Sequence, residues 1–203
     1  DNTYKVLVNK YEVYSNTVTN NTPKPPKPVK AVLDRSGKDI NGATTFDRNV
    51  TFRLVTDYSP YTKTLASAQA LGKKFAILDD VQDGAFSVYQ GNIKMTAAGK
   101  DVKSLFDMHH VLSDKGRTDA INKILKELNL QPRGEFYLWV AKDSKSFYHN
   151  YVKQNKNVTI DLPAKLLVKA GEKVKNDFKQ IDFGNSYQSN LVTVEVPNVK
   201  PEK

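Results

Sequence analysis

The stretch Gln188-Ser189-Asn190-Leu191-Val192-Thr193-Val194-Glu195-Val196 reads as the last strand of the chain. Because side chains alternate between the two faces of a strand, Asn190 is predicted to share a face with the apolar residues Val192 and Val194. A carboxamide buried on such a face without partners is costly. We therefore expect Asn190 either to be hydrogen-bonded or to take part in chemistry.

The same pattern occurs near the start of the chain. The segment Tyr14-Ser15-Asn16-Thr17-Val18-Thr19, followed by Pro23, shares Ser, Asn, Val and Thr at matching places with Gln188 to Thr193, which is followed by Pro197. Such self-similarity indicates tandem copies of one unit. Asn16 is then the counterpart of Asn190 in a preceding copy.

The repeat and the composition together predict the domain boundaries. We expect residues 1–22 to be the C-terminal hairpin of a preceding homologous domain, with strands between Tyr4 and Thr19. A Pro/Lys linker at 23–28 is extended and semi-rigid because proline restricts the backbone. Residues 29–197 form one complete domain, and 198–203 begin the linker to the next. The chain is thus expected to be part of a longer protein.

Hydrophobic periodicity within 29–197 predicts a mainly β fold. Glu135–Ala141 is apolar on both faces, which is typical of a central strand. Asp119–Leu130 has the spacing of an amphipathic helix, and further helices are expected over Thr64–Lys73 and from a cap at Ser144 to about Gln154. Strands toward both ends with helices in the crossovers indicate a β-sandwich with helical crossover insertions. The remaining predicted strands are Val29–Asp34, Asn49–Thr56, Phe75–Asp79, Val158–Val168 and Phe178–Phe183, together with a pair of strands within Phe86–Met95.

Composition excludes several classes of protein. The chain has 203 residues, no cysteine and a formal charge of +9. The absence of cysteine excludes disulfides and thiolate chemistry. The excess lysine is scattered, without an Arg-rich or aromatic-interleaved cluster, so we expect no nucleic-acid partner. No apolar run is long enough to span a bilayer, so membrane insertion is not expected.

Three polar residues fall on apolar strand faces: Lys30 with Val32, Asp79 with Ile77, and Asn190. Each alone has an ordinary interpretation: Lys30 as a solvated lysine at a strand edge, Asp79 as a turn-forming residue, and Asn190 as a hydrogen-bonded amide in the core. Together they suit an intramolecular Lys–Asn isopeptide bond. Burial lowers the pKa of a lysine and raises that of an aspartate, and a neutral Lys30 could attack the Asn190 carboxamide while protonated Asp79 assists.

Other motifs are weaker. His109 and His110 are adjacent and point to opposite faces of a strand, which disfavours a shared metal site. Asp79, Asp80 and Asp83 lack the spacing of a calcium loop, and a turn is the alternative interpretation. The sequence has no Gly-rich phosphate loop and no nucleophile elbow, so we do not expect an enzyme that turns over substrate.

At these residues the chain resembles the C-terminal region of the antigen I/II family of streptococcal surface adhesins, and the second C-terminal domain in particular. The resemblance covers nearly the whole chain from Lys24 onward. It is carried by Gly37-Lys38-Asp39-Ile40-Asn41-Gly42, Met108-His109-His110-Val111-Leu112-Ser113, Gly134-Glu135-Phe136-Tyr137-Leu138-Trp139-Val140-Ala141-Lys142-Asp143 and Gln180-Ile181-Asp182-Phe183-Gly184-Asn185.

The resemblance implies a variant immunoglobulin-like (DEv-IgG) sandwich that is stacked with neighbouring domains into an extracellular, cell-wall-anchored stalk. Its wall anchor would lie outside this sequence. It implies a Lys30–Asn190 isopeptide bond with Asp79 as the catalytic aspartate, Asp80 and Asp57 being the competitors, and an Asn16 left unlinked here.

The resemblance also bears on ligands. Some relatives bind calcium in these domains, which leaves calcium open as a ligand of this chain, although no cofactor is required. Partners would be a host glycoprotein or another microbial surface protein. A partner bacterium's fimbriae would meet Asn122–Leu130 and Asn157–Ile160. The alternative to a stalk role is a module that itself binds such a ligand through its helical insertions.

Overall fold

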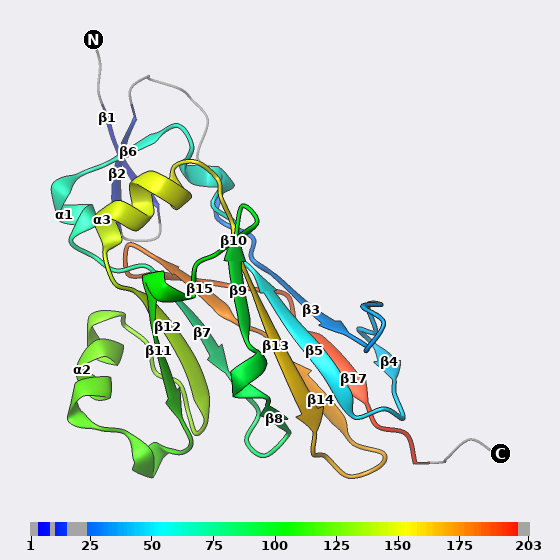
Figure 1. The fold of residues 1–203 in the computed structure, drawn as a ribbon. Coiled ribbons are helices and arrows are strands. Elements are labelled where there is room, and N and C mark those ends of the chain that lie inside the picture. Colours follow the sequence, from blue (N-terminus) through cyan, green and yellow to red (C-terminus); the bar gives the residue numbers. More distant parts are fainter. Residues whose placement is uncertain (1–3, 9–10, 16–23, 199–203) are drawn as a thin grey trace.

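Two large antiparallel sheets face each other in the computed structural model, which describes residues 4–8, 11–15 and 24–198 (Figure 1). One sheet has the order β10-β9-β13-β5-β3, with β8 also paired to β13, and the other has the order β11-β12-β7-β15-β16. The first comprises β3 (Val29–Leu33), β5 (Asn49–Val55), β8 (Phe86–Val88), β9 (Lys94–Ala97), β10 (Lys100–Asp101) and β13 (Val158–Leu166). The second comprises β7 (Ala76–Asp80), β11 (Phe106–Val111), β12 (Phe136–Ala141), β15 (Lys179–Asp182) and β16 (Asn185–Gln188).

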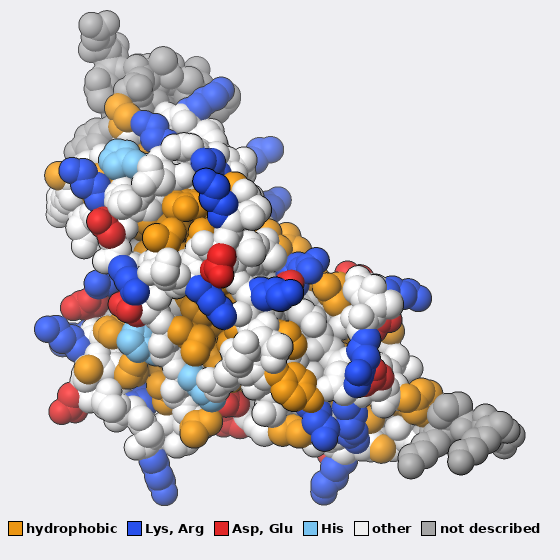
Figure 2. All heavy atoms as spheres, viewed as in Figure 1, with side chains coloured by type: hydrophobic (Ala, Val, Ile, Leu, Met, Phe, Trp, Pro, Cys, Tyr) orange, Lys and Arg blue, Asp and Glu red, His pale blue; other side chains and the backbone are white. Residues whose placement is uncertain are grey.

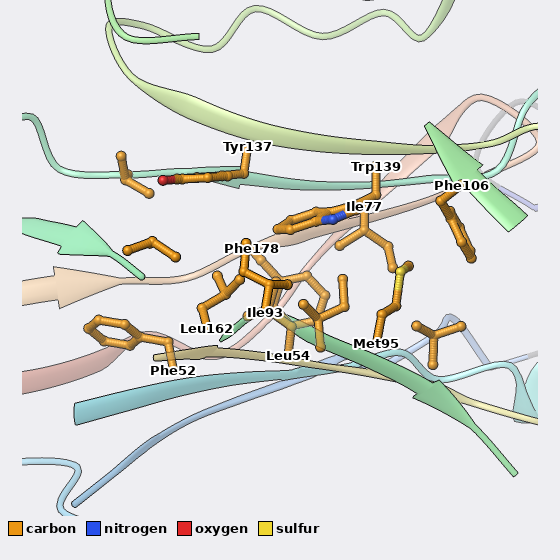
Figure 3. Packing of buried hydrophobic residues seen from close by; sticks show 14 of the residues in the cluster. Phe52, Leu54, Ile77, Ile93, Met95, Phe106, Tyr137, Trp139, Leu162 and Phe178 are labelled. Atoms are coloured by element: carbon orange, nitrogen blue, oxygen red, sulfur yellow. The ribbon is translucent and has the colours of Figure 1, made fainter. Parts of the chain in front are cut away.

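The main core lies between these sheets. Figure 3 shows Trp139 and Ile77 of one sheet pointing toward Leu54, Leu162 and Met95 of the other. All five are at most 2 % exposed. Apolar side chains at alternate positions of both sheets thus form the interior of a sandwich.

A second core covers the outer face of β12. Phe136, Leu138 and Val140 point away from the sandwich and pack with Leu125 and Leu128. These leucines come from helix α2 (Asp119–Glu127) and the residues after it; Thr118 caps α2 by accepting a hydrogen bond from the Ile121 N–H. Because α2 covers this sheet, β12 is buried on both faces, as its sequence predicts.

Two smaller sheets complete the fold. The first, of order β14-β17-β4, contains β14 (Lys173–Asn176), β17 (Val192–Glu195) and β4 (Ala43–Thr44). The second, of order β1-β2-β6, contains β1 (Tyr4–Val8), β2 (Tyr11–Ser15) and β6 (Thr64–Ala66). The N-terminal hairpin therefore pairs through its backbone with β6, a strand that follows β3 and β5 in the chain.

Two predictions of local structure are wrong, and a third is correct except for its capping residue. The expected helix over Thr64–Lys73 is strand β6 followed by the short α1 (Ala68–Leu71), because Thr64–Ala66 pairs with β2. The helix expected from Ser144 to about Gln154 is present as α3 (Ser144–Phe147), continued by one π-helical turn (Tyr148–Val152), but Asp143 and not Ser144 provides the cap. The strand predicted over Gln188–Val196 is interrupted between β16 and β17.

The single-turn 3-10 helices are Ser59–Tyr61, Gln90–Asn92, Lys103–Leu105 and Asp114–Gly116.

The mainly β, immunoglobulin-like sandwich with helical insertions is confirmed. Figure 2 shows the Lys and Arg side chains spread over the drawn face, between acidic and apolar ones. Within the described ranges, no helix has the length and apolar character needed to cross a membrane.

Candidate functional site

Lys30 and Asp79 meet between the two sheets. Lys30 lies in the edge strand β3, paired with Leu54, and Asp79 lies in β7, paired with Tyr137. Lys30 is 2 % and Asp79 0 % exposed, and the Lys30 Nζ donates a short hydrogen bond to Asp79 Oδ2. The alternation of side chains along the two strands therefore predicted correctly that both side chains face the interior.

The surroundings of this pair are apolar. The Lys30 amine lies 5.5 Å from the ring centroid of Phe52 and 5.9 Å from that of Phe178. Its other hydrogen bond is to the carbonyl of Asp177, at 3.4 Å. Burial lowers the pKa of Lys30 and raises the pKa of Asp79, and in each case burial outweighs the attraction between the two charges. Both shifts favour transfer of the proton from the amine to the carboxylate.

Of the three aspartates considered as the catalyst, Asp79 is the one that contacts the amine. Asp80 is exposed and accepts a hydrogen bond from the Arg133 N–H at 3.3 Å. The carboxylate of Asp57 accepts hydrogen bonds from the backbone of Lys27 and from Ser59. Neither competitor is placed to exchange a proton with Lys30.

The amide that the fold brings to this pair belongs to Asn176. Asn176 ends β14, is 3 % exposed, and its Nδ2 lies 3.4 Å from Asp79 Oδ2, the same oxygen that Lys30 contacts. The Asn176 Oδ1 and the Asp79 Oδ1 are buried without a hydrogen-bond partner in the described part of the chain. Amine, carboxyl and carboxamide thus converge on one buried point.

Asn190 occupies a different position from the one predicted. It precedes β17 and is exposed, so the expectation that it shares the buried face of Val192 and Val194 is wrong. Its Oδ1 accepts from the Lys30 N–H at 2.8 Å and its Nδ2 donates to the Lys30 carbonyl at 2.9 Å. The hydrogen bonds of the Lys30 amine go to Asp79 and Asp177 instead.

The sequence contained a signal for Asn176. In Lys173-Val174-Lys175-Asn176 the even-numbered residues are buried and the lysines are exposed, which is the alternation of a strand. The two lysines make the segment polar overall, and it was not predicted as a strand. Asn176 follows Val174 on the buried face, so the same alternation that selected Lys30 and Asp79 also selects this carboxamide.

The other predicted sites are distributed as follows. Asn16 lies outside the described residues. His110 stacks on Tyr137, with ring centroids 4.1 Å apart, and bonds to Glu135 at 2.7 Å. Asp83 accepts from the Glu135 N–H. Among the residues that the structure describes, no three His, Asp or Glu side chains are grouped so that they could hold a metal ion.

A second buried carboxyl group lies in β15. Asp182 is 0 % exposed, and its Oδ2 accepts from the Tyr61 hydroxyl at 2.8 Å and from Gln180 Nε2 at 2.6 Å. Its Oδ1 is buried without a hydrogen-bond partner among the described residues. Burial raises the pKa of Asp182 to about 7 although both hydrogen bonds act in the opposite direction.

Comparison with known proteins agrees with this architecture. Residues 28–196 match the family model described as the cell surface antigen I/II C2 terminal domain. The whole chain is 27 % identical to the aggregation substance of Enterococcus faecalis and spans 14 % of that protein.

Solved structures of the same kind are also similar. The C-terminal domain of AspA, an antigen I/II-family protein of Streptococcus pyogenes, is 32 % identical, with a TM-score of 0.74 over 85 % of this chain and 53 % of that one. The C-terminal domain of the Streptococcus agalactiae AgI/II polypeptide BspA is 33 % identical, with a TM-score of 0.67 over 84 % of this chain and 49 % of that one. This chain therefore spans about half of those structures, and it belongs to the cell surface antigen I/II family, whose C2 terminal domain it contains.

Proposed function

We propose that this chain is a structural stalk module of a cell-wall-anchored surface adhesin, stabilised by an isopeptide bond that it forms itself between Lys30 and Asn176. The observation that carries the proposal is the shared oxygen of Asp79, which lies against both the amine of one residue and the carboxamide of the other. Asn176 replaces Asn190 as the acceptor, because Asn190 is bonded to the Lys30 backbone.

The reaction begins with proton transfer from Lys30 to Asp79. This converts two desolvated ions into two neutral groups, in the direction in which burial shifts both pKa values. The neutral Nζ then attacks Cγ of Asn176. A half-turn of the carboxamide about its Cβ–Cγ bond brings its oxygen to the protonated carboxyl of Asp79, which stabilises the oxyanion as it develops.

The intermediate collapses with loss of ammonia. The Nζ–Cγ bond forms, the Cγ–Nδ2 bond breaks, and Asp79 carries a proton from Nζ to the departing nitrogen. The products are one amide and one ammonia, so no cofactor or oxidant is needed. The domain acts once on itself and does not turn over. On the chain-entropy description of a cross-link, a loop from Lys30 to Asn176 stabilises the fold by about 5 kcal/mol.

Intact-mass spectrometry combined with tryptic mapping tests this assignment. The matured chain is expected to be lighter than its sequence by one ammonia, with the fragment 176–179 joined to the one that contains Lys30. Lys30→Ala, Asn176→Ala and Asp79→Ala should each retain the full mass. Asn190→Ala is the matched control and should still lose ammonia once maturation is complete. A wild-type chain of unmodified mass would refute the proposal.

The wider role follows from the family. We expect the module to lie outside the cell between neighbouring stalk domains, and to support adhesion to a host glycoprotein or another microbial surface protein. Calcium is a candidate ligand of this domain because some relatives bind it.

One observation favours the second candidate, direct ligand binding by the helical insertions. A cavity of about 210 Å³ lies beside α3 and the π-turn, and Lys142, Asn150 and Tyr151 are among its lining residues. If the cavity binds a ligand, Asn150→Ala combined with Tyr151→Ala should abolish binding of the chain to an immobilised host glycoprotein, while Asn129→Ala, which follows α2 and does not line this cavity, should not. Equal binding by all three proteins would exclude this cavity as the binding site.

A further inference from the structure

The side chain of Asn190 bonds to Lys30 as a peptide group would. Its carboxamide accepts from the Lys30 N–H at 2.8 Å and donates to the Lys30 carbonyl at 2.9 Å. These two bonds satisfy both backbone groups of the residue whose side chain carries the amine. They are made on the outer side of β3, which is an edge strand of its sheet.

The preceding residue makes an equivalent pair of bonds to another segment. The Ser189 N–H donates to the Phe178 carbonyl at 2.9 Å, and the Ser189 hydroxyl accepts from the Phe178 N–H at 2.9 Å. Phe178 is two residues after Asn176, and its ring lies beside the Lys30 amine. The dipeptide Ser189–Asn190 therefore holds the backbones on both sides of the buried site.

This link matters because no strand ladder supplies it. Lys30 is in β3 and Asn176 is in β14, and these strands belong to different sheets. Attack of an amine on an amide carbon depends steeply on approach, and a misplacement of about 1 Å costs as much as about 100-fold in rate. Two segments that share no ladder need another means of fixing their separation.

We propose that Ser189 and Asn190 are positioning residues, which hold the Lys30 amine and the Asn176 carboxamide in register and so set the rate at which the bond forms. This rests on the proposed function. The dipeptide recurs as Ser15–Asn16 at the matching place of the preceding copy. The recurrence that singled out Asn16 and Asn190 is thereby explained without either being the acceptor.

The test measures the rate of cross-linking in folded protein. The full 203-residue chain is made by cell-free translation, synthesis is stopped with an inhibitor, and samples are denatured in acid at intervals for intact-mass analysis. Fluorescence of Trp139, the chain's one tryptophan, reports in parallel that the sandwich has formed. A residue that only stabilises the fold does not change the rate within molecules that are already folded.

Asn190→Ala and Ser189→Ala are expected to lose ammonia at least about tenfold more slowly than wild type, with the same final yield. Asn190→Asp keeps an acceptor for the Lys30 N–H and loses the donor to its carbonyl, so it should also be slow, and it provides the same test if the alanine variant does not fold. Asn41→Ala is the matched control, since Asn41 accepts from the Thr193 N–H of β17 and does not contact Lys30. It should react at the wild-type rate.

The outcomes separate the two proposals. Wild-type rates in folded Asn190 variants and in Ser189→Ala would overturn the positioning role and leave the cross-link intact. Equal slowing by Asn41→Ala would also overturn it, because the effect would then be a general loss of stability. No ammonia loss from wild type, with Trp139 buried, would instead refute the cross-link itself.

Discussion

Asp182 should make this domain less stable as the pH rises toward neutrality, and Asp182→Asn should remove that dependence. The carboxyl is fully buried, and among the residues that the structure describes its hydrogen-bond partners are the Tyr61 hydroxyl and Gln180, while the charge of Asp57 raises its pKa further. Ionisation therefore places a negative charge in the interior with two neutral hydrogen-bond donors to stabilise it.

The magnitude follows from the pKa of Asp182, which is raised from 3.8 to about 7 in the folded state. Because the folded state binds the proton more tightly, stability is fully present below pH 3.8 and is lost as the pH rises to about 7. Each pKa unit corresponds to about 1.4 kcal/mol, so the loss is about 4 kcal/mol. The asparagine variant keeps an oxygen for both donors and cannot ionise.

Urea unfolding of both proteins at half-unit steps from pH 4 to 8 provides the assay. The difference in unfolding free energy between Asp182→Asn and wild type should grow in favour of the variant by a few kcal/mol across this range, because the other titrating groups are common to both. Tyr61→Phe, which removes one donor to the carboxylate, should raise the pKa of Asp182 and extend the loss to higher pH. Parallel curves for wild type and Asp182→Asn would show that Asp182 does not titrate there, and the reasoning from burial would fail.

Three further substitutions test other parts of the structure. Gly134→Ala should destabilise the domain by about 1–3 kcal/mol in thermal unfolding, because Gly134 has φ +67° and an added Cβ would lie 2.3 Å from the Asp83 carboxylate; an unchanged melting temperature would contradict that contact. Thr118→Ala removes the cap that accepts from the Ile121 N–H and should cost about 1 kcal/mol, with Thr118→Ser as the control that retains it. Asp80→Asn should cross-link to completion by intact mass, and a stalled reaction would return Asp80 to the list of possible catalysts.

Much of the fold could be predicted from the sequence, namely those strands and helices whose own hydrophobic pattern identifies them. The run Glu135–Ala141 is apolar on both faces because α2 covers one face and the sandwich core the other. Lys30 and Asp79 were placed correctly because each lies inside an unbroken strand, where alternation holds. The segment Thr64–Ala66 was predicted wrongly as helix, because it forms a strand by pairing with β2. The spacing of apolar residues within a segment does not show that a distant strand will pair with it.

The side chain of Asn190 was misplaced for a related reason. Alternation was extended from Val192 back to Asn190 across a place where the strand is interrupted, and there the side chains of Ser189 and Asn190 bond to other backbones. Which of the two asparagines lies beside Asp79 depends on how β14 and β17 are ordered in a third sheet. A single sequence does not specify that order.

The position of Asn176 has a mechanical consequence. A stalk transmits tension along its chain, and a covalent bond from β3 to the end of β14 would carry that tension past everything between Lys30 and Asn176. Residues after Asn176 would still bear load, and they include β17, which lies antiparallel to β14 with Val192 beside Asn176. Pulling from the far end of β17 therefore shears the two strands along their length. Rupture of this pairing would release the segment after β16, residues 189–196, an extension of at most roughly 30 Å, while the two large sheets stay together. The domain would then lengthen by a limited, fixed amount while the part closed by the bond stays folded.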